Sequence, residues 1–95
     1  MRVVINGSEI RSEADFHKKI AEAMGFPSYY GENLDALWDI LSTDIERPVT
    51  LVWENAAYSK ESMGNGFARI VDLLNRVVAQ DNEWELDERF EVVID

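Results

Sequence analysis

Three short apolar runs, rich in β-branched side chains, constrain the fold of this chain more than any other feature. They cover residues 3–5, 49–53 and 90–94, and longer segments with helical spacing of apolar residues separate them. Strands that alternate with helices are typical of βαβ units, in which the strands form a parallel sheet. We therefore expect an α/β fold built on a parallel sheet of these three strands.

The length of 95 residues fits one domain, and no repeat, low-complexity tract or Pro/Gly/Ser-rich linker divides it. We expect residues 1–95 to form a single domain. The chain has no cysteine, which excludes disulfides, thiolate metal sites and cysteine nucleophiles. No apolar run is long enough for a membrane span or a secretory signal, so we expect a cytoplasmic protein.

Capping residues indicate where the first two helices begin and end. Ser12 begins a capping-box pattern, and Gly25 is suited to the left-handed position that follows a helix. Asn33 is a good N-cap for a second helix. We expect this second helix to run from Asn33 to about Ser42.

Two further helices are expected before the last strand, over residues of about 56–62 and 67–80. Their expected N-caps are Asn55 and Asn65. Residues 81–89 are rich in acidic side chains and are expected to form an exposed loop. The possible apolar tethers of this loop are Trp84 and Leu86.

Nineteen acidic and nine basic residues give a net charge of −10. A chain with this charge is repelled by nucleic acid and by anionic membrane surfaces, so we expect it to bind neither directly. Its natural long-range partner is cationic, such as a basic protein or a metal. The alternative is that the acidic excess only provides solubility, and net charge alone does not separate these two interpretations.

The distribution of charge does separate them. No basic residue occurs between Lys19 and Arg47, and that stretch contains six acidic residues: Glu22, Glu32, Asp35, Asp39, Asp44 and Glu46. Asp35 and Asp39 are four residues apart on the expected second helix, where like charges repel each other. A pattern that costs stability without a structural return is typical of a binding site.

Aromatic residues flank the acidic side chains within this stretch. Tyr29 and Tyr30 adjoin Gly31 in the expected loop, and two adjacent tyrosines cannot easily both point inward, so we expect one to be exposed. Trp38 lies at the edge of the apolar stripe of the second helix, where a core position is the simpler interpretation. Tyr and Trp are also favoured anchors at protein interfaces, because they bury large areas at low entropic cost.

Residues suited to enzyme or metal chemistry are sparse. His17 is the only histidine, and without a second His or a Cys we expect it to be structural, with a hydrogen bond to a neighbouring loop. Asp35 and Asp39 lack a desolvating pocket that would separate their pKa values as an acid/base pair requires. A hard-metal site of Glu32, Asp35 and Asp39 is conceivable, but no calcium-binding loop is present. We therefore predict a protein that is not an enzyme and that uses no metal or cofactor.

Residues 29–39 resemble the signature of the barstar family, the intracellular inhibitors of barnase-type secreted bacterial ribonucleases. The resemblance also covers residues 4–7, 10–12 and 15–17, with weaker matches further along the chain. It implies a three-stranded parallel sheet with four helices. It also implies an inhibitor that occludes the active site of a guanyl-preferring microbial ribonuclease with its second helix and the loop before it.

The resemblance assigns roles to individual residues. It implies that Asp39 is the carboxylate that enters the phosphate-binding pocket of the enzyme. The supporting contacts would be Tyr29, Gly31, Asn33, Leu34, Asp35 and Trp38. A ribonuclease holds Arg, Lys and His groups around the scissile phosphate, and a carboxylate can replace that phosphate through charge-assisted hydrogen bonds.

Three positions at the edge of this surface depart from the family pattern. Thr43 stands where the pattern has glycine, Asp44 where it has an interface tryptophan, and Arg76 where it has an acidic residue. We therefore predict that the partner is a secreted basic ribonuclease bound one to one, and that barnase itself is inhibited more weakly than the cognate enzyme. The alternative interpretation is an acidic module that masks a different basic protein.

Overall fold

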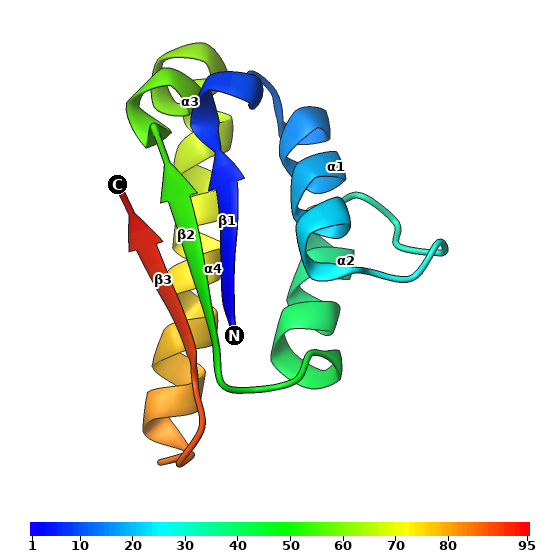
Figure 1. Ribbon diagram of the computed structural model, residues 1–95, viewed down its shortest axis with the longest axis vertical. Helices are drawn as coiled ribbons and strands as arrows, with labels where there is room; N and C mark the ends of the chain where they lie inside the picture. The colour runs from blue at the N-terminus through cyan, green and yellow to red at the C-terminus, as the bar shows by residue number, and fades with distance from the viewer.

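The computed structural model describes residues 1–95, and its strands and helices alternate along the chain (Figure 1). The elements in chain order are β1 (Arg2–Asn6), η1 (Gly7–Glu9), α1 (Glu13–Met24), α2 (Leu34–Asp39), η2 (Ile40–Asp44), β2 (Val49–Glu54), α3 (Ala56–Met63), α4 (Asn65–Glu83) and β3 (Phe90–Ile94). The three expected strands and four expected α-helices are all present, so the predicted fold class is confirmed.

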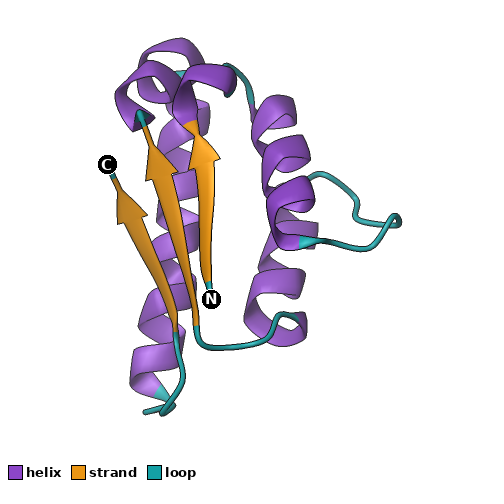
Figure 2. Ribbon diagram, viewed as in Figure 1, coloured by secondary structure: helices purple, strands orange, loops and turns teal.

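The sheet has the strand order β1-β2-β3, and both strand pairs are parallel (Figure 2). The register aligns Val4 with Val52 and Val52 with Val93. Long helical crossovers join the strands, as parallel pairing requires. All three strands therefore end at the same edge of the sheet.

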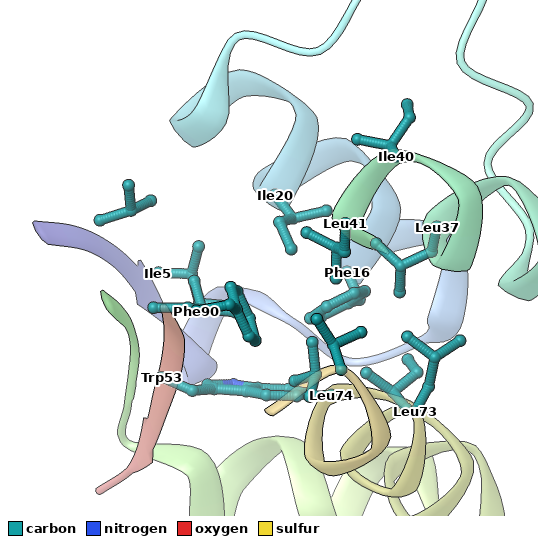
Figure 3. Close-up of a cluster of buried hydrophobic side chains, with 14 of the residues drawn as sticks. Ile5, Phe16, Ile20, Leu37, Ile40, Leu41, Trp53, Leu73, Leu74 and Phe90 are labelled. Carbon is teal, nitrogen blue, oxygen red and sulfur yellow. The ribbon is translucent and has the colours of Figure 1, made fainter. Parts of the chain in front are cut away.

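Helices cover one face of the sheet. In Figure 1, α4 runs behind the strands, while α1 and α2 lie together beside the β1 side. The core between these layers contains the fully buried Phe16, Leu37, Trp53 and Phe90, from α1, α2, β2 and β3 (Figure 3). On the opposite face, Val4 of β1 remains 44% exposed. The helix α2 is therefore held by its apolar side and presents its other side outward.

The local signals for helix ends are correct for α1 and α2. The Ser12 hydroxyl accepts a hydrogen bond from the Asp15 amide at 3.1 Å, and Gly25 is left-handed with φ of 69°. Asn33 caps α2 as expected. The prediction for Asn65 is wrong, because this residue already lies inside α4. Gly64, with φ of 57°, alone separates α3 from α4, so no room remains for a cap at Asn65.

Asn55 occupies the expected cap position of α3 but makes no capping hydrogen bond. Its backbone is left-handed, with φ of 53°, which asparagine tolerates better than most residues. Its side-chain Nδ2 donates instead to Oδ1 of Asn6 at 3.0 Å. Asn55 therefore joins the ends of β2 and β1.

The prediction of an exposed acidic loop over residues 81–89 is wrong at its start. The helix α4 continues to Glu83, and Asp81 is fully buried because it pairs with Arg47. Trp84 is 64% exposed, so it is no tether, whereas Leu86 is half-buried. One residue of this acidic segment, Asp81, therefore lies in the protein interior.

Candidate functional site

The acidic segment is positioned by a short, well-capped helix. Oδ1 of Asn33 accepts a hydrogen bond from the Ala36 amide at 2.8 Å, and its Nδ2 donates to the Gly31 carbonyl at 3.2 Å. Asn33 therefore fixes both the start of α2 and the loop before it. Leu37 is fully buried, while Asp35 and Asp39 lie on the exposed side of the helix. The predicted separation of apolar and acidic faces is confirmed.

The sequence predicted a second helix that runs to about Ser42. In the structure, α geometry ends at Asp39. The helix widens after Asp39 into the π-helical segment η2, and the Ile45 amide bonds to the Ile40 carbonyl at 3.1 Å. The Thr43 hydroxyl donates to the Asp39 carbonyl at 2.6 Å. A hydroxyl that bonds to the carbonyl four residues earlier often bends a helix, and π turns are frequent at functional sites.

The carboxylates of this segment have no cationic partner within the chain. The four ion pairs of the structure are Glu9–Lys19, Glu13–Arg69, Asp81–Arg47 and Asp72–Arg76. None of them includes the acidic surface, which we define as Glu32, Asp35, Asp39, Asp44 and Glu46. All five residues are exposed. Their negative charge is therefore available to an external cation.

A cleft of about 260 Å³ lies beside Asp39, and it brings several predicted site residues together. Its lining includes Tyr29, Gly31, Asp39 and Asp44. Tyr29 is 80% exposed, whereas Tyr30 is buried, so the expectation that only one of these tyrosines points inward is confirmed. A flat aromatic ring beside two free carboxylates is suited to contact a cationic group.

Asn33, Leu34 and Asp35 line a second, larger cleft of about 410 Å³ on the other side of the α2 N-terminus. Glu13 of α1 and Arg69 of α4 complete it, and these two residues form an ion pair at 3.2 Å. No sequence pattern indicates this contribution from α1 and α4, because Glu13 and Arg69 are 56 residues apart. The predicted site residues therefore face two neighbouring clefts.

Of the remaining predicted residues, Trp38 of α2 and Arg76 of α4 meet each other, and Thr43 lies in η2. Trp38 is half-buried and packs against the core, which agrees with the simpler of its two interpretations. The guanidinium carbon of Arg76 lies 5.6 Å from the centre of the Trp38 ring, and its Nε is 3.3 Å from Oδ2 of Asp72. Arg76 therefore places a positive charge at the border of the acidic surface. Thr43 is exposed, and its hydroxyl oxygen also lies 3.1 Å from Asp44 Oδ1.

His17 makes the structural hydrogen bond that the sequence predicted. Its Nδ1 is 2.6 Å from the Tyr30 hydroxyl, in the loop before α2. Burial lowers the pKa of His17 below its usual value, against the opposing effects of Glu13 and Glu32. Burial, followed by the nearby charge of Glu32, raises the pKa of Tyr30. The pair holds the loop against α1.

The structure contains no cluster of three or more His, Asp or Glu side chains that could hold a metal ion. None of the helices has the length and apolar composition that a membrane-spanning helix requires. The unpaired acidic surface is suited to bind a cationic partner.

Comparison with known proteins agrees with this geometry. Residues 1–95 match the family described as Barstar (barnase inhibitor). The Bacillus subtilis (strain 168) protein named "Putative ribonuclease inhibitor YrdF" is 30% identical over 94 residues, which are 99% of this chain and 98% of that protein. The match extends across both the sheet and the acidic surface. The chain therefore belongs to the barstar family.

Proposed function

We propose that this protein inhibits a secreted basic ribonuclease of the guanyl-preferring, barnase-like type by occluding its active site. The observation that carries the proposal is the acidic surface, whose five exposed carboxylates have no cationic partner within the chain. The family description and the name of the B. subtilis relative support a role in ribonuclease inhibition. Inhibition before secretion would protect the producing cell, so we place the protein in the cytoplasm.

The chemistry of inhibition follows from what a ribonuclease active site must contain. Cationic groups surround the scissile phosphate, and a carboxylate in their midst forms charge-assisted hydrogen bonds. In this proposal Asp39 occupies the phosphate position, and Asp35 and Tyr29 make supporting contacts. Asn33 and Leu37 fix the helix that carries these groups, which reduces the entropy lost on binding.

The test is a panel of purified guanyl-preferring ribonucleases that includes barnase. We expect the protein to inhibit at least one of them at a stoichiometry of one to one. Asp39→Ala should weaken inhibition at least about a hundredfold, or roughly 2.7 kcal/mol, because the cations of the enzyme lose their partner. Glu61→Ala, which removes an exposed carboxylate from α3, is the matched control and should leave inhibition unchanged.

Two results would contradict the proposal. The first is a failure to inhibit any member of the panel, and the second is an Asp39→Ala variant that binds within threefold of the wild type. Arg76 and Asp44 favour a second candidate in that event, because both depart from the family pattern at the edge of the surface. The protein would then mask a different basic protein, and isolation of the complex from the native cell would identify it.

A further inference from the structure

Arg47 forms the most extensively connected side-chain contact in the molecule. Its Nε donates to Oδ2 of Asp81 at 2.6 Å, and its Nη2 donates to Oδ1 of the same carboxylate at 3.1 Å. The side chains of Arg47 and Asp81 are only 13% and 1% exposed. A two-pronged pair of this kind fixes both direction and distance, because the guanidinium is planar and the carboxylate matches it.

The same guanidinium also reaches the end of the acidic surface. Its Nη2 donates to the Leu41 carbonyl at 2.8 Å, and its Nη1 donates to the Ile45 carbonyl at 3.3 Å. Both carbonyls belong to η2 or directly follow it. Carbonyls at the end of a helix lack partners within the helix, and a cation there also interacts favourably with the helix dipole.

Asp81 is itself held from a second direction. Its Oδ2 accepts a hydrogen bond from the Phe90 amide at 2.8 Å, at the start of β3. Burial alone would raise the pKa of Asp81, but hydrogen bonds from Arg47 and Phe90 and the charges of Arg47 and Arg89 lower it below its ordinary value. The carboxylate therefore remains ionised at neutral pH and gives Arg47 a rigid anchor on α4 and β3.

No other hydrogen bond joins η2 to a distant part of the chain. The hydroxyls of Ser42 and Thr43 bond to the Asp39 carbonyl at the end of α2, and the Ile45 amide bonds to the Ile40 carbonyl, so all three contacts are local. The polar connection between η2 and the parts of the chain beyond α2 therefore passes through Arg47 alone. Apolar packing of Ile40 and Leu41 adds the non-directional part of the attachment.

We propose that Arg47, anchored by Asp81, is a positioning residue that holds Asp39 and Asp44 in their binding geometry. This inference rests on the proposed function, since it assigns a role in binding to a pair that the partner does not need to touch. If the pair were lost, η2 would have to become ordered during binding. The complex would then dissociate faster, whereas the charges that guide association would be unchanged.

Arg47→Lys is the informative variant, because it keeps the net charge but removes the two-pronged geometry. Its control is Ser59→Ala, which lowers global stability through a buried hydrogen bond far from η2 in the chain. Two measurements compare the variants: amide exchange of Ile45 in the free protein, and association and dissociation rates with barnase. If barnase does not bind the wild type, another ribonuclease from the panel that does bind replaces it.

For Arg47→Lys we expect Ile45 to exchange at least about tenfold faster and the complex to dissociate at least about fivefold faster, with association within twofold. Ser59→Ala should leave both Ile45 exchange and dissociation unchanged, although its urea midpoint falls. If Arg47→Lys does not fold, Asp81→Asn replaces it, because the amide oxygen can still accept from Phe90.

Dissociation within twofold of the wild type, or an equal acceleration in Ser59→Ala, would overturn the positioning role. If Arg47→Lys still binds and its Ile45 exchange is unchanged, Arg47 does not hold η2 in place, and the positioning role is refuted although the proposed function stands. A wild-type protein that binds no ribonuclease would instead refute the proposed function, and with it any role of Arg47 in binding. In that case, faster Ile45 exchange in Arg47→Lys would show only that the Arg47–Asp81 pair stabilises η2.

Discussion

Replacing Ser59 by alanine should destabilise the protein strongly, although it removes only one oxygen atom. Ser59 is fully buried on α3. Its hydroxyl donates to the Gly7 carbonyl at 2.8 Å and accepts from Nε1 of Trp53 at 3.2 Å. One side chain therefore joins α3 to the first connection of the fold and to the central strand.

The size of this destabilisation depends on the hydrogen bonds that Gly7 and Trp53 keep when the Ser59 hydroxyl is removed. The Gly7 carbonyl still accepts from the Ile10 amide at 3.1 Å, so it loses one of two hydrogen bonds, a loss of about 1 kcal/mol. Trp53 is fully buried and its Nε1 has no other acceptor, so this donor is left unsatisfied at a cost of about 1–3 kcal/mol. We expect Ser59→Ala to lower the free energy of unfolding by about 2–4 kcal/mol.

Urea denaturation followed by far-UV circular dichroism measures this loss. Ser62→Ala, an exposed serine on the same helix, is the matched control and should change the free energy of unfolding by less than about 0.5 kcal/mol. Trp53→Phe removes the donor that Ser59→Ala leaves unsatisfied. In that background, the loss caused by Ser59→Ala should shrink by at least about 1 kcal/mol. Equal losses in both backgrounds, or a loss below about 1 kcal/mol, would refute the reasoning.

Three further predictions concern pH, association and specificity. The buried His17 has a folded-state pKa below its ordinary 6.5, so its contribution to stability is complete above pH 6.5 and is lost as pH falls through the folded pKa. An NMR titration that gives a pKa at or above 6.5 for His17 would contradict this prediction. Neutralising the exposed Asp44 and Glu46 should slow association with the target ribonuclease at low salt and leave dissociation nearly unchanged, which stopped-flow rates at two ionic strengths would test. Asp44→Trp combined with Arg76→Glu should improve affinity for barnase and weaken affinity for the cognate enzyme; changes below about 0.5 kcal/mol in both would place these positions outside the interface.

Much of the fold is local in origin and was therefore predictable. The runs that became β1, β2 and β3 carry their strand signal in β-branched composition, and Ser12, Gly25 and Asn33 act through backbone groups within a few residues. The acidic surface was also visible, because the absence of basic residues between Lys19 and Arg47 is a property of one continuous stretch. Its residues stay exposed and unpaired in the structure, as that distribution indicated.

Other features depend on contacts between distant parts of the chain. Asp81 lies in an acidic segment and resembles a solvated residue, yet it is buried because Arg47, 34 residues earlier, meets it in space. Two local features also differ from the expectations: the Thr43 hydroxyl bonds to the Asp39 carbonyl where the helix widens into η2, and Gly64 leaves no room for a cap at Asn65.

The sequence by itself determined the α/β alternation, the start of α2 and the single sign of its exposed face, since each depends on periodicity or charge within one segment. Only the tertiary structure decided that Glu13 and Arg69 complete a cleft beside Asp35, and that Arg76 lies over Trp38. It also decided that Arg47 holds the end of the acidic surface. The physical reason is that an ion pair or a stacked ring is specified by position in space, and residues far apart in the chain leave no periodic trace of their meeting.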